Sequence, residues 1–262
     1  MLTLPLRSLA RLLPKRLVGW SAYRYPSGRR AYGQFGEDVL LARLLPEARG
    51  CYVDIGAFHP KFGSNTYFLW KRGWRGINVD VDDYKIAMFR YFRPGDVNLT
   101  LGISSANAER TFYSQDKGSY GSMSSFEAEF AQSRGERMGR SVSSRTVAVR
   151  TLNWLFEEHL PREADGSFIS VDLLNIDVEG HEYEILRAFD ISRFRPRCVC
   201  VEIHAAGIDE LEQSATFQLL RREGYQLVAW PAPSCIFTLA PLAQTGSSAA
   251  SAANPETLRR SA

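Results

Sequence analysis

The sequence predicts an α/β fold built on a mainly parallel sheet with helices on both of its faces. First, short apolar runs alternate with helical patterns along the 262 residues, and such alternation forms right-handed βαβ units. Second, several runs are apolar at nearly every position, as expected of strands that are buried on both faces. Third, the last two runs are only four residues apart, which is hairpin spacing, so we expect the last strand to be antiparallel.

Seven runs have the length and composition of strands. In chain order they are CYVDI (51–55), GINVDV (76–81), VNLTLGI (97–103), LLNIDV (173–178), CVCVEI (198–203), YQLVAW (225–230) and CIFTL (235–239). The spacing of apolar residues between them predicts helices over 67–72, 84–92, 152–159, 182–189 and 211–223. We expect one domain over residues 31–242, because a chain of this length with 45% hydrophobic residues can bury a large core.

The basic residues are concentrated at the N-terminus. Residues 1–30 carry seven basic residues and no acid, whereas the rest of the chain has 25 basic and 29 acidic residues. A mildly acidic body argues against a protein that binds nucleic acid. No apolar run reaches the roughly 18–20 residues of a membrane-spanning helix. The four cysteines form no C-x-x-C pair, which indicates reduced core residues of a cytoplasmic protein.

Three segments differ in composition from the body. Residues 1–20 combine leucines near helical spacing with a basic stripe, and two interpretations stay open. The segment is either an arm packed on the body or a contact with an anionic surface, which would place the protein at the inner membrane. Residues 243–262 are rich in Ala and Ser and are expected to form a disordered tail. The polar insertion 114–145 is expected to act as a lid over an acceptor.

Polar residues follow the first two strands, where open α/β sheets bind ligands. Asp54 and Gly56 lie at the end of the first strand, and Asp80 ends the second, where a ribose is held in such folds. The G-x-G-x-x-G pattern of dinucleotide sites is absent, because Phe-His-Pro at 58–60 replaces its glycines. The sequence thus offers an acid that can hold a ribose but no glycine loop that can hold a pyrophosphate. This combination disfavours NAD and FAD as cofactors and favours S-adenosyl-L-methionine.

The fourth strand ends in a turn that is crowded with acids. Asp177, Glu179 and Glu182 lie there together with His181. Carboxylates at this position suit a cationic centre and a hydroxyl that must lose a proton. Acids at the start of the following helix would also stabilise its dipole, which is the structural alternative.

The fifth strand ends with Glu202 and His204. The histidine is a candidate base or, together with Asp177 and Glu202, a candidate metal ligand. The spacing is only weakly indicative of a metal site, so we predict none.

Four segments between residues 32 and 204 carry a resemblance to a known family. They are YGQFGEDVLL (32–41), VDIGAFHPKFGSNTYFL (53–69) with GWRGINVD (73–80), GSMSSF (121–126) and LLNIDVEGHEYEIL (173–186). Together they resemble FkbM-type methyltransferases, which depend on S-adenosyl-L-methionine. The resemblance implies a Rossmann-like class I methyltransferase fold, with seven strands in the order 3-2-1-4-5-7-6 and the seventh antiparallel.

The resemblance also implies roles for individual residues. Those expected at the cofactor are Gln34, Glu37, Asp54, Gly56, Ala57, Asn65, Asp80, Ser104 and the adjacent Ser105. Asp177 and Glu179 are expected to face the methyl-transfer centre. The candidate bases are Asp177, ranked first, His59 and His204. The sequence departs from the family pattern at His181 and at Val-Asp-Asp 81–83.

The predicted function is O-methylation of a hydroxyl on a saccharide, glycolipid or secondary metabolite. The alternative is a non-catalytic cofactor-binding or scaffold protein in a surface-polysaccharide assembly complex, which the basic arm and the tail permit. The presence of Asp54, Asp80 and Asp177 together favours the enzyme. A nucleotide-binding Rossmann enzyme is disfavoured by the missing glycines. The acceptor and the oligomeric state are left open.

Overall fold

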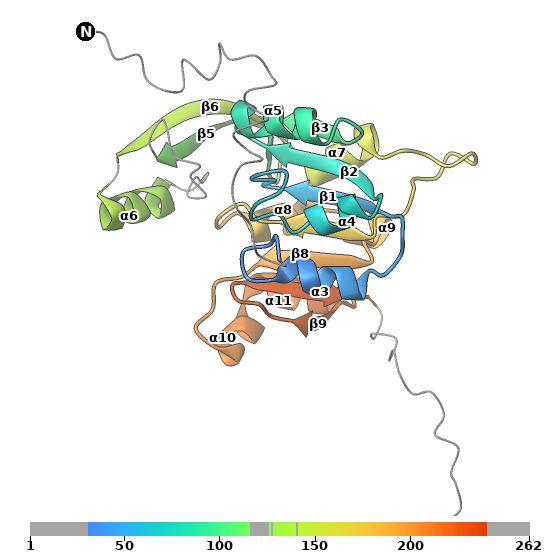
Figure 1. Ribbon diagram of the computed structural model, residues 1–262. Helices are drawn as coiled ribbons and strands as arrows, with labels where there is room; N and C mark the ends of the chain where they lie inside the picture. Colours follow the sequence, from blue (N-terminus) through green and yellow to red (C-terminus); the bar gives the residue numbers. More distant parts are fainter. Residues whose placement is uncertain (1–30, 116–125, 127, 140, 240–262) are drawn as a thin grey trace, which may run out of the picture.

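All seven predicted strands enter one mixed sheet. The computed structural model describes residues 31–115, 126, 128–139 and 141–239 (Figure 1). The strand order is β3-β2-β1-β7-β8-β10-β9. The strands are β1 Cys51–Ile55, β2 Arg75–Asp80, β3 Val97–Thr100, β7 Leu173–Ile176, β8 Cys198–Glu202, β9 Gln226–Ala229 and β10 Ser234–Thr238. The α/β fold with a mostly parallel seven-stranded sheet is therefore confirmed.

The pairing of the strands divides the sheet into a parallel and an antiparallel part. Along the sheet, β3, β2, β1, β7 and β8 pair in parallel, each with the next. The strand β10 runs antiparallel to both of its neighbours, β8 and β9. The parallel part brings the carboxyl ends of β1, β2 and β7 to one edge, which is where α/β sheets bind their ligands.

Side chains of the central strands alternate between two hydrophobic cores. Val53 and Ile55 of β1 pack into one core, and Tyr52 between them packs into the other. The first core is completed by α7 Leu152–His159, α8 Glu182–Ala188 and α11 Ala215–Arg222. The second is completed by α3 Glu37–Leu44 and α4 Tyr67–Lys71. Burial on both sides explains why β1 and β7 are almost entirely apolar.

Polar side chains at the helix starts set several boundaries. Asp82 accepts a hydrogen bond from the amide of Tyr84 and caps α5 Asp83–Phe92. Ser214 accepts one from the amide of Phe217 and caps α11. The single helix predicted over 211–223 is wrong for this reason, because the extended backbone at Ser214 divides it. The remaining short helices are α9 Ile191–Phe194 and α10 Ile208–Gln213.

The predicted strand 97–103 is interrupted at Leu101, whose amide bonds to the carbonyl of Asp80 at 3.2 Å. The chain then enters a second sheet of order β4-β6-β5, in which β5 and β6 form an antiparallel hairpin that we did not predict as strands. Its elements are β4 Gly102–Ile103, β5 Ala108–Gln115, α6 Ala128–Met138 and β6 Val142–Arg150. Figure 1 shows β5, α6 and β6 as an arm that extends from the body.

Some predictions concern residues outside the part of the chain that the structure describes. These are the basic arm 1–30, its membrane segment 1–20 and the tail 243–262. The predicted lid 114–145 is described in part, since its ends belong to β5 and β6 and it contains α6. Among the described residues, no helix is long and apolar enough to cross a bilayer.

A buried guanidinium holds the loop that follows β1. Arg93 is fully buried and donates to the carbonyl of Pro60. It also donates to Ser64 Oγ at 3.0 Å and to Thr66 Oγ1 at 2.9 Å. The ring of Phe89 lies 5.0 Å from the guanidinium. Because a buried cation must be paired and hydrogen-bonded, this set of contacts fixes the loop 60–66.

The same guanidinium reaches an acidic partner through a phenol. Arg93 Nη1 donates to the hydroxyl of Tyr52 at 3.2 Å, and this hydroxyl donates to Asp96 Oδ2 at 2.5 Å. Asn78 on β2 also donates to Asp96, at 3.1 Å. Burial raises the pKa of Asp96, and the hydrogen bonds from Tyr52 and Asn78 oppose that rise. The positive and negative groups are therefore buried as one connected network.

We predict that Arg93→Met destabilises the protein by about 3–5 kcal/mol, because it leaves the buried carboxylate of Asp96 without its compensating cation. Urea unfolding followed by circular dichroism measures this free energy. The matched control is Arg90→Met, since Arg90 is exposed on the same helix. Equal effects of the two substitutions would contradict a special role for Arg93.

Candidate active site

The strand ends bring Gly56 against Asp177, two residues that the sequence placed in the site. Gly56 has a φ of 81°, a left-handed conformation that favours glycine. A Cβ atom at this position would lie 1.7 Å from the carbonyl oxygen of Asp177. The amides of Gly56 and Ala57 both bond to the carbonyl of Val79 on β2. Only glycine therefore permits the close approach of the turns after β1 and β7.

Asp54 lies in a buried network directly before this turn. Its Oδ2 accepts from Thr66 Oγ1 at 2.7 Å, and its Oδ1 accepts from Asn175 Nδ2 at 2.8 Å. Asn65 donates in turn to Asn175 Oδ1 at 3.1 Å. Burial raises the pKa of Asp54, whereas the hydrogen bond from Thr66 and the charge of Arg93 oppose the rise. The structure thus brings Asp54 and Asn65 together.

Asp80 ends β2 beside the glycine turn and is 5% exposed. Its Oδ1 accepts from the amide of Asp82 at 2.8 Å, and its Oδ2 accepts from Lys85 Nζ at 3.2 Å. Burial raises the pKa of Asp80, and the charge of Lys85 opposes that rise. A carboxylate offers about four acceptor positions, so these two donors leave room for hydroxyl groups.

The predicted residue Gln34 lies in the loop before α3, and Glu37 is the first residue of that helix. Glu37 is buried, and it accepts from the amide of Phe35 at 2.8 Å and from Ser234 Oγ at 3.1 Å. Gln34 is exposed. The loop lies against the Asp54 network, because a Cβ at Gly33 would come within 2.9 Å of Asn65 Oδ1. The buried carboxylate of Glu37 fixes this loop to β10, so of the two predicted residues Gln34 is the one that presents its side chain to solvent.

Ser104 follows the short strand β4 and is buried. Its hydroxyl lies 3.0 Å from His181 Nε2, and Arg110 Nη1 lies 3.0 Å from both atoms. The ring of Phe126 lies 5.8 Å from that of His181. The side chain of Ser105 is partly buried beside it. The unusual His181 therefore joins the arm to the turn after β7.

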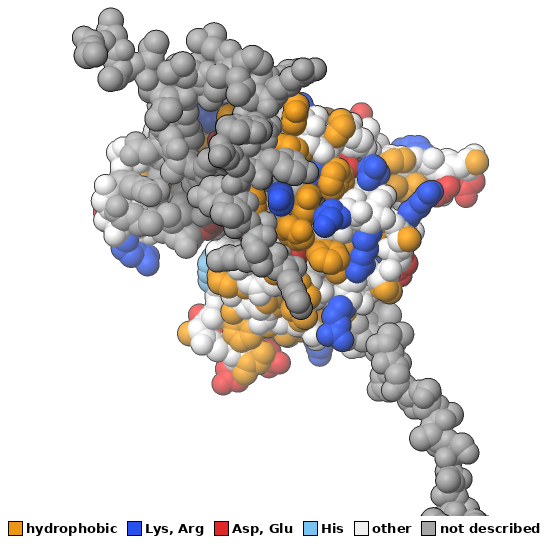
Figure 2. Space-filling view, in the orientation of Figure 1, with side chains coloured by type: hydrophobic (Ala, Val, Ile, Leu, Met, Phe, Trp, Pro, Cys, Tyr) orange, Lys and Arg blue, Asp and Glu red, His pale blue; other side chains and the backbone are white. Residues whose placement is uncertain are grey.

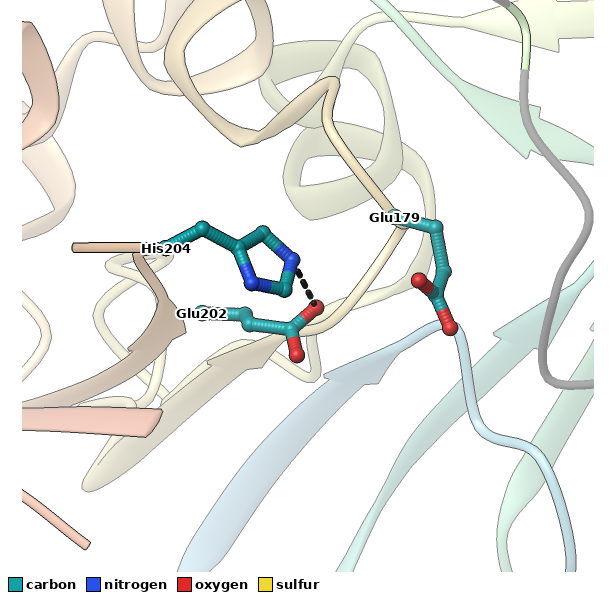
Figure 3. Close-up of side chains that lie close together, drawn as sticks. All are labelled: Glu179, Glu202 and His204. Carbon is teal, nitrogen blue, oxygen red and sulfur yellow. Dashed lines mark ion pairs between the residues drawn. The ribbon is translucent and has the colours of Figure 1, made fainter. Parts of the chain in front are cut away.

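The carboxyl ends of β7 and β8 form an acidic cluster. Glu179, Glu202 and His204 each place a potential ligand atom within 4.8 Å of the others, as Figure 3 shows. His204 Nε2 lies 3.6 Å from Glu202 Oε2, and the imidazole is half exposed. Asp177 and Glu182 form a second such group with the same Glu202. These five residues are called the acidic cluster below.

Within the acidic cluster, Asp177 and Glu182 have different surroundings. Burial, followed by the charges of Glu202 and Glu179, raises the pKa of Asp177 well above its ordinary value. Glu182 instead accepts from the amides of Val178 and Gly180, at 3.0 Å and 3.1 Å. Glu182 therefore stabilises its own turn, whereas the neighbouring carboxylates increase the proton affinity of Asp177.

His59 occupies the turn after β1. Its Nδ1 accepts from the amides of Lys61 and Phe62, both at 3.0 Å. Burial lowers the pKa of His59 to about 4, so its imidazole is neutral at neutral pH. It lines a cavity of about 30 Å³ together with Tyr67 and Trp70. His59 does not belong to the acidic cluster, which contains the other two candidate bases.

Several partners in the site were not predicted from the sequence. They are Thr66, Lys85, Arg93, Arg110 and Asn175, and each binds a predicted residue or its network. Asn175 had a detectable signal, because an amide inside the apolar run LLNIDV requires a buried partner. Lys85 and Arg110 had none, since basic residues on a helix or a strand are usually solvated.

The arrangement supports two kinds of chemistry. A carboxylate whose pKa is raised is a stronger base than an ordinary one, and Asp177 has a raised pKa. The two groups that share Glu202 also have the spacing of divalent-cation ligands. Asp80, at the neighbouring strand end, offers acceptors for hydroxyl groups.

Comparison with protein families identifies one match. Residues 54–227, well over half of the chain, match the model described as the methyltransferase FkbM domain. The match begins at Asp54 and includes the turns that carry Asp80 and Asp177. Comparison with curated proteins found no match.

We predict that Asp177→Asn stabilises the protein at neutral pH. The raised pKa means that the folded state holds this proton more tightly than the unfolded state, whose value is near 3.8. The resulting stability is complete below that value and is lost as the pH rises through the folded pKa. The amide cannot ionise, so the variant avoids this loss, and its advantage should disappear toward pH 4.

Urea unfolding of both proteins across this pH range measures the difference. The control is Asp83→Asn, because Asp83 is exposed at the start of α5. A variant that is less stable than the wild type by the same amount at every pH would show that Asp177 does not titrate as described.

Proposed function

The chain belongs to the FkbM methyltransferase family, and we propose that it transfers a methyl group from S-adenosyl-L-methionine to a hydroxyl of a saccharide, glycolipid or secondary metabolite. The observation that carries this proposal is the placement of Asp80 and Asp177 on either side of the glycine turn after β1. The first offers acceptors to hydroxyl groups, and the second accepts a proton.

The donor set at the strand ends fits the proposed cofactor. Asp80 has acceptor positions left for the two hydroxyls of a ribose. Gly56 and Ala57 would lie along the methionine part of the cofactor, and Ser104 would lie near its adenine. Asp54 would hold the end of β1 in place. When bound, S-adenosyl-L-methionine supplies a methyl group on a positively charged sulfur.

Asp177 is the proposed general base. Its raised pKa allows it to take the proton of an acceptor hydroxyl as the oxygen attacks the methyl carbon. A hydrogen bond joins Asp177 to Glu202, and Glu202 lies beside the half-exposed His204. This arrangement gives the proton a way to solvent. Glu179 faces Glu202 across the acidic cluster and adds negative charge near the cationic centre.

Calorimetric titration with S-adenosyl-L-methionine tests the cofactor site. The wild type is expected to bind in the micromolar range, and Asp80→Ala is expected to weaken binding by at least about tenfold, because hydrogen bonds to a charged acceptor are lost. Asp83→Ala is the matched control, since this acid is exposed three residues further along. Unchanged affinity of Asp80→Ala would remove the ribose assignment.

The same preparations, supplied with hydroxylated acceptors, test the base. Asp177→Asn is expected to retain cofactor affinity and to lose about 10²–10⁴-fold in turnover. Full turnover by this variant would eliminate Asp177 as the base. Cofactor binding without transfer to any acceptor, in the wild type, would favour the non-catalytic alternative.

We also propose that the arm formed by β5, α6 and β6 covers the acceptor. Arg110 of β5 contacts both Ser104 and His181, so the arm is joined to the turn that leads to the acidic cluster. Phe126 packs on the same histidine. A movement of the arm would therefore displace His181 and the turn after β7.

Replacing residues 117–140 with a short Gly-Ser linker tests this role and leaves β5 and β6 in place. We expect the KM for the acceptor to rise while the Kd for S-adenosyl-L-methionine is retained. Steady-state kinetics and calorimetry give the two constants. An unchanged acceptor KM would show that α6 and the residues around it do not contact the acceptor.

A further inference from the structure

The helix α4 and the loop before α3 carry aromatic and basic side chains together. We call this the aromatic face. Its members are Tyr32, Phe35, Tyr67, Phe68, Trp70, Lys71 and Arg72. Figure 2 shows hydrophobic side chains gathered over α4 and its neighbours, with Lys and Arg beside them and few acids.

The rings of Tyr32, Tyr67, Phe68 and Trp70 form one continuous layer. The centroids of Tyr32 and Tyr67 are 4.6 Å apart, and Tyr67 stacks on Trp70 at 5.7 Å. Phe68 lies 6.3 Å from Tyr32. Phe35, in the adjoining loop, is 54% exposed, which is unusual for so large an apolar side chain. The layer thus extends a hydrophobic surface toward solvent.

Cations lie directly over these rings. Lys71 Nζ is 5.5 Å from the centroid of Tyr32, and the guanidinium of Arg72 is 5.4 Å from that of Phe68. Lys71 is exposed, and the aromatic face contains no acid. Its charge is therefore complementary to an anionic partner.

The position of the N-terminal segment supports the same conclusion. Residues 1–30 carry seven basic residues and no acid, and they join the described chain next to Tyr32. The N-terminal segment and the aromatic face are both basic, so both would be attracted to the same negatively charged surface.

We propose that the aromatic face docks on an anionic phospholipid bilayer. Aromatic rings settle at the level of lipid headgroups, and Lys and Arg attract acidic headgroups. A soluble polyanion would engage the cations but would gain nothing from the exposed ring of Phe35 and the partly exposed ring of Phe68. The proposal does not depend on the methyl-transfer chemistry, because the aromatic face and the acidic cluster share no residue.

Co-sedimentation of the full-length protein with vesicles tests the proposal. Vesicles of phosphatidylcholine alone are compared with vesicles that contain phosphatidylglycerol in equal part. Each positive charge near an anionic surface increases the vesicle affinity roughly fivefold. Lys71→Glu changes the charge by two units, so it should weaken vesicle binding roughly 25-fold. Phe35→Ser with Phe68→Ser should also weaken it. The matched controls are Arg221→Glu in the last turn of α11 and Ile208→Ser on α10, where Ile208 is 49% exposed.

Three results together would support the proposal. Vesicle binding should require phosphatidylglycerol, and it should weaken as the salt concentration rises. It should also be reduced by the two face variants and by neither control. A full-length variant with Arg7, Arg11, Lys15 and Arg16 changed to Gln separates the N-terminal segment from the face. If this variant no longer binds vesicles while the two face variants still bind them, the proposal is overturned. The proposal would also be overturned if the wild type did not bind these vesicles. The same holds if the protein bound soluble polyphosphate as tightly as the vesicles and the Phe substitutions did not change that binding.

Discussion

The buried guanidinium of Arg93 is the interaction on which the site depends. It holds the loop 60–66 through Pro60, Ser64 and Thr66. Thr66 then donates to Asp54, and Asp54 accepts from Asn175 on the neighbouring strand. One cation therefore connects the edge helix α5 to the centre of the sheet. Burying a charge is unfavourable unless every donor is used, so this connection favours a single arrangement of the strand ends.

The fold was largely predictable because apolar runs mark strands that are buried on both faces. The seven runs all entered the main sheet. The errors arose where local signals were weak. The run 97–103 looks continuous, yet a hydrogen bond from Leu101 to Asp80 directs the chain into a second sheet. The strand β6 was missed because only Val147 and Val149 of it are buried, and its other residues are mostly polar and exposed.

The site was predictable in its positions and less so in its contacts. Strand ends in a parallel sheet meet at one edge, so Asp80 and Asp177 could be placed from the sequence alone. Their environments depend on residues that are distant in the chain or on another face of a helix. The proton affinity of Asp177 depends on Glu202, 25 positions away, and no spacing pattern encodes that distance. The sequence also offered no sign that Lys85 would reach Asp80.

The position of β10 has a consequence for how the protein is made. This strand comes last among the described elements, yet it lies between β8 and β9 and pairs with both. During synthesis β9 therefore has no neighbour in the sheet until Ser234–Thr238 has left the ribosome, and the free edge of β8 stays unpaired until then. Unpaired edges invite wrong association. The nascent chain thus has to remain apart from other chains until β10 has been translated.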